Sequence, residues 1–272
     1  MNLSVCLITY NEEWIIGKTL ESIKKIADEI VIVDSHSTDS TVEIAKHYGA
    51  RIYTESFKGF GLQKNSALEK CTCKWVLFID ADEIVTPELA QSIKETVDND
   101  ADTDIFSIRF QSVCFGKHIK HGGWSNFYRI RLFKRDAGCY SSHAVHEVFL
   151  PREGKTSAFI KQDIYHYTYR SVEHYINKVN CYTTKKAQAN FEKGKKARFT
   201  KLVLSPPLIF FKMYIFKLGI LDGFHGLVLA KFSAFYAIIA LFKQRNMELD
   251  ETKKKRVKQH DKKEVPSAYY VG

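Results

Sequence analysis

Short apolar runs alternate with helix-like patterns over the first third of the chain. The runs occupy residues 3–9, 29–34, 50–54 and 75–79. Between them, apolar residues recur at three- and four-residue spacing or follow clusters of helix-capping residues, which indicates amphipathic helices. This alternation with short connections predicts an α/β fold, with a Rossmann-like, mostly parallel central sheet, right-handed crossovers and helices on both faces.

Polar or acidic residues stand where several of these strands end. Thr9-Tyr10-Asn11 closes the first strand, Asp34 the second, and Asp80-Ala81-Asp82 the fourth. Because the carboxyl ends of parallel strands lie on one edge of a sheet, these groups should converge. Carboxylates and substrate phosphates are the ligands of hard divalent cations, so the Asp-x-Asp could hold a metal and a diphosphate. On position alone, it could equally cap the helix expected from Pro87.

The pattern changes beyond residue 83. It predicts a helix over 87–97, a strand over 105–113 and a helix over 170–191. Residues 128–133 alternate basic with apolar side chains, which is typical of an edge strand over a charged cleft. Neither a Gly-x-Gly-x-x-Gly after the first strand nor a P-loop motif occurs in the sequence, so dinucleotide-binding and P-loop functions lose their main support.

Two apolar stretches, 202–221 and 227–242, follow the predicted catalytic domain of residues 1–195. Lysines interrupt both, so neither offers a clean span of about 20 uncharged residues, and Pro206-Pro207 should break any helix through the first. We expect residues 196–247 to form amphipathic helices lying on a membrane, with lysines on the polar faces. The alternatives are a helical hairpin that packs on the catalytic domain and a re-entrant or membrane-spanning segment.

Residues 248–272 form a basic tail that suits anionic lipid headgroups. The chain of 272 residues carries a formal charge of +10, with a pI near 9.1. That balance predicts an anionic partner, either a nucleotide diphosphate, an acidic lipid surface or a nucleic acid. A nucleic acid is the weakest of the three, because no nucleic-acid signature occurs and converging carboxylates would repel phosphate without a metal. The scattered cysteines fit a reducing, cytoplasmic location.

Four stretches of the chain resemble family 2 glycosyltransferases of the GT-A fold. They are Val5-Cys6-Leu7-Ile8-Thr9-Tyr10-Asn11-Glu12, Ile32-Val33-Asp34-Ser35-His36-Ser37-Thr38-Asp39-Ser40-Thr41, Gln63-Lys64-Asn65 and residues 75–83. Within that family, three features are similar to bacterial lipopolysaccharide-core β-glucosyltransferases. These are Asp80-Ala81-Asp82-Glu83, Val145-His146-Glu147 and Gly219-Ile220-Leu221-Asp222-Gly223-Phe224-His225-Gly226-Leu227.

The resemblance implies an inverting transfer of a sugar from a nucleotide diphosphate-sugar, UDP-glucose by likeness, to a lipid-linked glycan such as the lipopolysaccharide core. Mg²⁺ or Mn²⁺ would be the cofactor, with Asp82 as its ligand. The implied nucleotide-sugar contacts are Thr9, Tyr10, Asn11, Glu12, Asp34, Lys64, Asp80 and Ala81. A lipid-linked acceptor would require the enzyme on the inner face of the cytoplasmic membrane. A sugar-nucleotide-binding protein without catalysis is the alternative within the same fold.

Inverting transfer needs a carboxylate base for the acceptor hydroxyl. Glu147 is our candidate, because it follows a strand-like segment and lies beside His146. The alternative is an ordinary salt bridge to Arg129 or Arg131. His146 is predicted to ligate the metal or to hold Glu147 in place, although a lone histidine is more often structural.

The remaining candidates would contact the acceptor or a phosphate. Glu83 follows the Asp-x-Asp directly, and Arg129 and Arg131 point the same way along their predicted strand. Trp124 could stack on an acceptor sugar or belong to the core. Asp39 is expected to cap the helix that follows it and is not assigned to catalysis.

Overall fold

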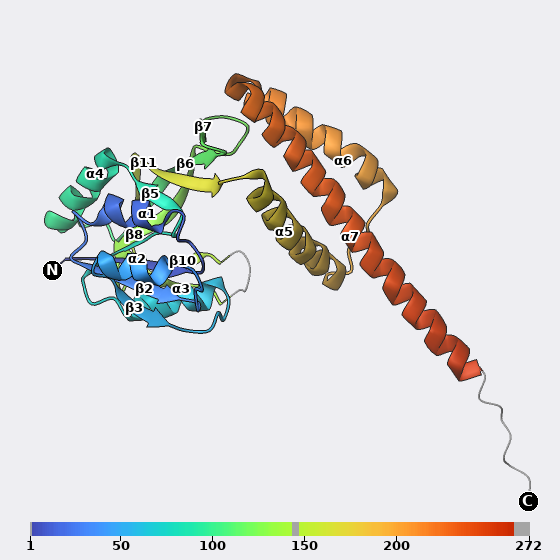
Figure 1. Ribbon diagram of the computed structural model, residues 1–272, viewed down its shortest axis with the longest axis horizontal. Coiled ribbons are helices and arrows are strands. Elements are labelled where there is room, and N and C mark those ends of the chain that lie inside the picture. The colour runs from blue at the N-terminus through green and yellow to red at the C-terminus, as the bar shows by residue number, and fades with distance from the viewer. Residues whose placement is uncertain (1, 143–146, 264–272) are drawn as a thin grey trace, which may run out of the picture. The chain divides into compact units, whose positions relative to one another are not determined.

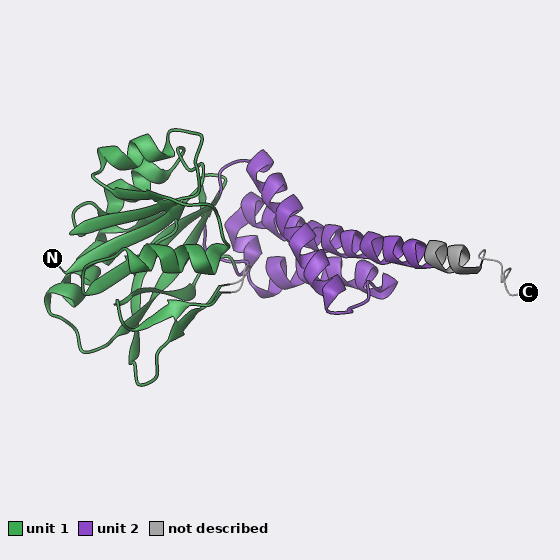
Figure 2. Ribbon diagram, turned by 90° about the horizontal axis from the view of Figure 1, so that it is seen from below, with its two compact units in different colours: residues 1–118, 124–168 green, residues 119–123, 169–272 purple. Residues whose placement is uncertain are grey.

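The computed structural model describes residues 2–142 and 147–263. The chain divides into two compact units, coloured green and purple in Figure 2. The first unit comprises Met1–His118 and Trp124–Thr168, and the second comprises Ile119–Gly123 and Tyr169–Gly272. The short segment Ile119–Gly123 therefore leaves the sheet of the first unit and packs with the C-terminal helices.

Within the described residues, a nine-stranded sheet organises the first unit (Figure 1). Its strands are β1 (Leu3–Thr9), β2 (Glu29–Asp34), β3 (Arg51–Thr54), β4 (Trp75–Phe78), β5 (Glu83–Val85), β6 (Ile105–Cys114), β7 (Lys117–Ile119), β8 (Phe127–Lys134) and β11 (Ser157–Tyr169). They lie in the order β3-β2-β1-β4-β8-β6-β11-β5, and β7 pairs with β6. A separate two-stranded sheet joins β9 (Gly138–Tyr140) to β10 (Phe149–Pro151).

The first four strands of the order are parallel, as predicted. Strand β1 pairs in parallel with β2 and β4, and β2 pairs in parallel with β3. The register sets Thr9 opposite Asp34, so both side chains reach the same edge. Beyond β4 the sheet turns antiparallel, because β8 pairs antiparallel with both β4 and β6.

The prediction that residues 128–133 form an edge strand is wrong. Strand β8 lies between β4 and β6, in the interior of the sheet. Its alternating pattern arises because Leu132 and Phe133 pack into hydrophobic clusters while Arg131, also buried, pairs with carboxylates. The basic side chain of Arg131 thus belongs to a buried ionic network and is not exposed to solvent.

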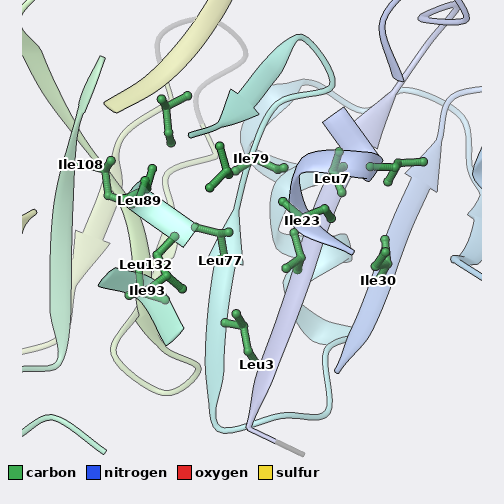
Figure 3. Packing of buried hydrophobic residues seen from close by; sticks show 14 of the residues in the cluster. Leu3, Leu7, Ile23, Ile30, Leu77, Ile79, Leu89, Ile93, Ile108 and Leu132 are labelled. Atoms are coloured by element: carbon green, nitrogen blue, oxygen red, sulfur yellow. The ribbon is translucent and has the colours of Figure 1, made fainter. Parts of the chain in front are cut away.

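Helices cover both faces of the sheet. They are α1 (Ile16–Ile23), α2 (Thr41–His47), α3 (Phe60–Glu69) and α4 (Pro87–Asp98). Figure 3 shows side chains of α1 and α4, such as Ile23, Leu89 and Ile93, packed around Leu7 and Leu77 of the sheet. A second hydrophobic cluster contains Ala67 and Leu68 of α3. They pack with every second residue of the parallel strands, such as Cys6 in β1. This is the period-2 arrangement of strands buried on both sides.

The second unit is helical. It contains α5 (Val172–Glu192), α6 (Phe199–Phe211), the π-helical turn η1 (Lys212–Phe216), the 3₁₀ turn η2 (Gly219–Asp222) and α7 (Gly223–Lys263). The ring of Tyr175 in α5 stacks on Phe232 in α7 at 4.3 Å, and its hydroxyl donates to the Phe232 carbonyl. This packing groups α5 with the C-terminal helices, although the sequence analysis placed it in the catalytic domain. The predicted tail from residue 248 continues α7 as far as Lys263.

The prediction that Pro206-Pro207 breaks the helix is also wrong, because both prolines lie inside α6. Proline fixes φ near −65°, which is a helical value, and removes one backbone donor. The helix therefore continues without the bonds that Pro206 and Pro207 would have donated to Leu202 and Val203. The π-helical turn η1 begins at Lys212, five residues after Pro207.

The turn between α6 and α7 explains the glycines of residues 219–227. A Cβ on Gly226 would lie 1.8 Å from the Gly219 carbonyl oxygen, so the two backbones touch there. Asp222, buried in this turn, accepts bonds from the backbone nitrogens of Lys120 and His121, at 3.2 and 2.8 Å. The motif thus closes the helical hairpin and ties Ile119–Gly123 to it.

Candidate active site

Asp34, at the end of β2, is held by hydrogen bonds from Thr9 and Ser37. Its Oδ1 accepts from the hydroxyls of Thr9 (2.8 Å) and Ser37 (2.6 Å), and its Oδ2 accepts from the Ser37 backbone nitrogen at 2.8 Å. Asp34 is almost fully buried, so these donors replace water around the carboxylate. The predicted convergence of Thr9 and Asp34 is confirmed.

The loop after β1 is locked onto the loop after β2. Asn11 adopts a left-handed conformation, which asparagine tolerates well, and its Oδ1 accepts from the Thr38 backbone nitrogen at 2.8 Å. The Glu12 backbone nitrogen donates to Thr41, and the Glu12 carboxylate accepts from the Trp14 indole at 2.9 Å. Tyr10 leaves its ring 59% exposed on this loop.

Asp39 binds the backbone nitrogens of Glu13 and Thr41, at 3.1 and 3.0 Å. Its carboxylate therefore joins the loop after β1 to the start of α2, in accord with the predicted capping role. Neither contact gives it a catalytic function.

Lys64 is the centre of the site. Its Nζ lies 3.1 Å from Asp80 Oδ1 and 2.8 Å from Glu147 Oε1, and the residue is only 3% exposed. The same ammonium group sits over the rings of Phe78 and Tyr140, at 5.0 and 5.4 Å. One buried cation thus joins the carboxylate after β4 to the predicted base.

The residues beside Lys64 fix its helix in place. Asn65 makes a two-way contact with Tyr140, donating to its carbonyl and accepting from its nitrogen, both at 2.8 Å. Gln63, fully buried, donates to the Ser35 hydroxyl at 3.3 Å. The motif Gln63-Lys64-Asn65 therefore aligns α3 between the end of β2 and the strand β9.

Gly61 lets α3 approach the segment that leads to Glu147. A Cβ there would lie 1.8 Å from the Ser141 carbonyl oxygen and 3.5 Å from Glu147 Cβ. Only glycine permits such a close backbone contact. The short distance from Lys64 to Glu147 depends on this approach.

Arg131 is the second buried cation of the site. Its guanidinium donates to Glu83 through Nε (3.0 Å) and Nη2 (2.6 Å), and Nη2 also donates to Asp80 Oδ2 at 2.8 Å. Asp80 is thus clamped from both sides, by Arg131 and by Lys64. Its backbone nitrogen also donates to Glu83 at 3.0 Å.

The charges explain the protonation states. Burial alone would raise the pKa of Asp80, but Lys64 and Arg131 lower it well below its usual range. Burial raises the pKa of Glu83, against the opposing effect of Arg131. Burial would lower the pKa of Arg131, but Glu83 and Asp80 raise it. Asp80 is therefore a fixed anion, and Arg131 a fixed cation.

Asp82 faces a histidine that the sequence analysis did not assign. His166 in β11 places Nε2 3.4 Å from Asp82 Oδ2. Burial would lower the pKa of His166, but the Asp82 carboxylate raises it. The only sequence signal for this residue is that histidines stand at positions 143, 146 and 166, and nothing in that grouping distinguishes His166 from the other two.

Asp82 supplies a carboxylate oxygen of the kind that Mg²⁺ and Mn²⁺ prefer, and His166 places a ring nitrogen beside it. The described residues contain no group of three or more His, Cys, Asp or Glu side chains that could hold a metal alone. Asp82 and His166 would therefore supply only part of a coordination shell, as is usual where substrate phosphates and water complete it. The predicted ligand His146 lies outside the described residues.

The remaining candidates contact other parts of the protein. Arg129, two residues from Arg131, is exposed and sits over the Phe127 ring at 5.4 Å. Trp124 is half-buried, and its carbonyl accepts from the Ser112 hydroxyl at 2.5 Å. Ala81 is buried, and its carbonyl accepts from Thr19 at 2.7 Å. Contacts of Arg129, Arg131, Glu83 or Trp124 with acceptor or phosphate stay predictions.

A mostly parallel sheet with acidic residues at its strand ends is the arrangement expected of a glycosyltransferase, and comparison with known proteins agrees. The family model described as glycosyl transferase family 2 matches residues 4–149. The chain belongs to this family, has the GT-A fold, and is a glycosyltransferase.

The chain is similar to relatives of comparable length. It is 33% identical to the lipopolysaccharide core biosynthesis glycosyltransferase LpsC of Rhizobium meliloti, over 89% of this chain and 91% of that protein. An uncharacterized glycosyltransferase of Rickettsia typhi is 31% identical over 91% of this chain and 88% of its own. Among solved structures, residues 1–349 of S. aureus TarS match 90% of this chain and 92% of that chain, with 15% identity and a TM-score of 0.46.

The buried clamp on Asp80 yields a stability prediction. Replacing Arg131 with Met leaves Glu83 without its buried counter-charge and Asp80 with Lys64 alone, and breaking a buried ion pair in this way typically costs about 3–5 kcal/mol. We expect urea denaturation to show a loss of that size in the free energy of unfolding. Arg129→Met, on the same strand but exposed, should cost less than about 1 kcal/mol.

A double variant provides the control for this prediction. Arg131→Met with Glu83→Gln removes one uncompensated charge and should recover part of the loss. Equal stabilities for Arg129→Met and Arg131→Met would contradict the role given to the clamp.

Proposed function

We propose that this glycosyltransferase moves a sugar, with inversion, from a nucleotide diphosphate-sugar to a lipid-linked glycan of the lipopolysaccharide-core type. UDP-glucose is the donor we propose, on the likeness to β-glucosyltransferases. The identity with a lipopolysaccharide core biosynthesis protein supports the acceptor class. The observation that carries the mechanism is the pair of contacts from Lys64 to Asp80 and Glu147.

The donor side of the site is built from the strand ends. Thr9, Tyr10, Asn11 and Glu12 line the nucleotide pocket, and Asp34 contacts the base or ribose. Asp80, held as an anion by Lys64 and Arg131, orients the ribose or the sugar. Fixed dipoles and charges of this kind need no reorganisation during the reaction, which is how they lower its barrier.

Asp82 and His166 would hold the divalent cation against the diphosphate. When bound, the metal supplies Lewis-acid stabilisation of the charge that grows on the phosphate oxygens. Lys64 adds a positive charge next to Asp80, so the protein itself also opposes the charge of the leaving group.

Glu147 acts as the base. As the acceptor hydroxyl attacks the anomeric carbon, its proton passes to the Glu147 carboxylate and the bond to the diphosphate breaks with its electron pair. Attack from the face opposite the leaving group inverts the anomeric configuration. Lys64 positions this carboxylate at 2.8 Å, next to the donor side of the site.

A lipid-linked acceptor places the enzyme at the inner face of the cytoplasmic membrane. The helical unit carries exposed apolar side chains, and its chain ends in a basic segment, both of which suit binding to anionic lipid. No observation favours a nucleic acid as the anionic partner.

The metal assignment predicts the behaviour of two variants. Asp82→Asn and His166→Gln should each weaken Mn²⁺-dependent binding of UDP-glucose by about tenfold or more, because each removes a ligand. Isothermal titration with and without Mn²⁺ measures this. Asp136→Asn, on the surface, is the matched control and should bind normally. Unchanged Mn²⁺ dependence in either test variant removes that residue from the metal site.

The base assignment predicts a separation of binding from turnover. Glu147→Gln keeps an oxygen that can accept from Lys64 but cannot take a proton, so donor affinity should stay within about twofold. Transfer should fall by about 10²–10⁴-fold, the usual contribution of a general base. Glu153→Gln, in an exposed turn, is the control. Wild-type transfer by Glu147→Gln would place the base elsewhere.

Membrane association predicts co-sedimentation of the full chain with phosphatidylglycerol vesicles. Deleting the chain from residue 249 onward removes the basic run 253–256, and each basic residue near an anionic surface contributes about 1 kcal/mol. Vesicle binding should fall at least roughly tenfold, and the salt dependence should fall with it. If the truncated and the full chain bind vesicles equally at every salt concentration, the tail has no role in membrane binding.

A further inference from the structure

Helix α6 and the turn η1 have no buried residue at all. Leu204, Leu208, Phe211 and Ile215 recur at spacings of four, three and four, so they share one face of the helix. All four are exposed, Leu208 to 66%. A helix of a water-soluble protein normally buries such a stripe against its own core.

Helix α7 carries a second exposed stripe. Phe224, Lys231, Phe235, Ile238 and Phe242 follow the same helical spacing and are all exposed. The opposite face of α7 is occupied, since Ala230, Ala237, Ala240 and Gln244 are buried. The helix therefore has one packed side and one apolar side open to solvent.

The charges around these stripes are almost all positive. Residues 193–247 contain a single acidic side chain, Asp222, which is buried in the turn between α6 and α7. The basic residues of the same range are Lys193, Lys195, Lys196, Arg198, Lys201, Lys212, Lys217, Lys231, Lys243 and Arg245. Apolar stripes with a cationic border match an anionic lipid leaflet.

Length alone would let this hairpin cross a membrane. Residues Phe199–Phe216 and Gly219–Lys255 are both long and apolar enough by length and composition, and the first has none of its window buried. Figure 1 shows α6 and α7 side by side. The choice between crossing the bilayer and lying on it must therefore come from the contacts of the tip.

The tip of the hairpin holds a polar segment of the chain. Asp222 accepts from the backbone nitrogens of Lys120 and His121, and the Gly122 nitrogen donates to the Lys217 carbonyl at 2.8 Å. That segment begins at Ile119, the last residue of β7, and the chain re-enters the sheet at β8. If the hairpin crossed the bilayer, its tip would lie on the far side. The end of β7 and the start of β8, which this segment joins, would then have to be carried across about 30 Å of hydrocarbon.

From these contacts we infer that α6, η1, η2 and the first half of α7 lie in the plane of one anionic leaflet, as a monotopic surface that does not cross it. The inference rests on the proposed membrane association and specifies its surface and depth. The stripe Leu204, Leu208, Phe211 and Ile215 enters the boundary between headgroups and acyl chains, and the lysines remain at the headgroups. A second copy of the chain is a poorer occupant, because it would bring the same basic residues together.

Fluorescence quenching by brominated lipids tests the depth. Leu208→Trp, Phe216→Trp and Phe235→Trp are separate variants of the full chain, each at an exposed position, and the signal of the parent is subtracted. Val172→Trp, equally apolar and 49% exposed but located on α5, is the matched control. The vesicles contain phosphatidylglycerol with bromines placed either near the headgroups or near the chain ends.

We expect all three test positions to be quenched at least about twofold more by shallow than by deep bromines, and Val172→Trp to be quenched by neither. Deepest quenching at Leu208, with Phe216 at another depth, would mean a crossing hairpin and overturn the inference. If the protein binds vesicles but none of the three tryptophans is quenched, the proposed membrane-binding surface is wrong.

Two parallel measurements separate the possible failures. Co-sedimentation of the parent shows whether the protein binds vesicles at all, so absence of binding rejects the proposed membrane association itself. Sedimentation equilibrium without lipid tests whether a second copy of the chain covers the stripe instead. A dimer that Leu208→Gln dissociates would assign the stripe to a second copy and overturn the inference.

Discussion

The site depends on the burial of two cations, Lys64 and Arg131, around one carboxylate. Removing an ion from water is costly, so each charge can be buried only because an opposite charge lies within hydrogen-bonding distance. Asp80 forms ion pairs with both cations at once. Glu83 is the second partner of Arg131, and Glu147 is the second partner of Lys64. The carboxylates keep fixed positions because any displacement would leave a buried charge unpaired.

The fold brings these groups together from distant parts of the chain. The parallel strands place Asp34 and Asp80 at one edge of the sheet. Helix α3 supplies Lys64, and the antiparallel strand β8 places Arg131 in contact with Asp80. Gly61 allows the segment leading to Glu147 to approach the same helix. The sheet therefore combines a parallel half, where the donor is proposed to bind, with an antiparallel half that supplies Arg131 as a counter-charge.

Local patterns were enough to predict the parallel half of the sheet, its helices and the convergence of Thr9 and Asp34. They could not locate Arg131 or His166, because both positions depend on pairings between strands far apart in sequence. Strand β8 enters between β4 and β6, and β11 brings His166 to Asp82. The Pro206-Pro207 prediction failed for another reason: a proline removes a bond, but its φ remains compatible with the helix.

The position of Lys64 has a kinetic consequence. The cation that holds Glu147 also contacts Asp80, the residue proposed to orient the ribose or the sugar of the donor. In the proposed mechanism the donor diphosphate and Glu147 share this one ammonium group, so arrival of the donor would loosen the base from its ion pair. The base would then be released only once the donor is bound, which would favour a compulsory order with donor before acceptor.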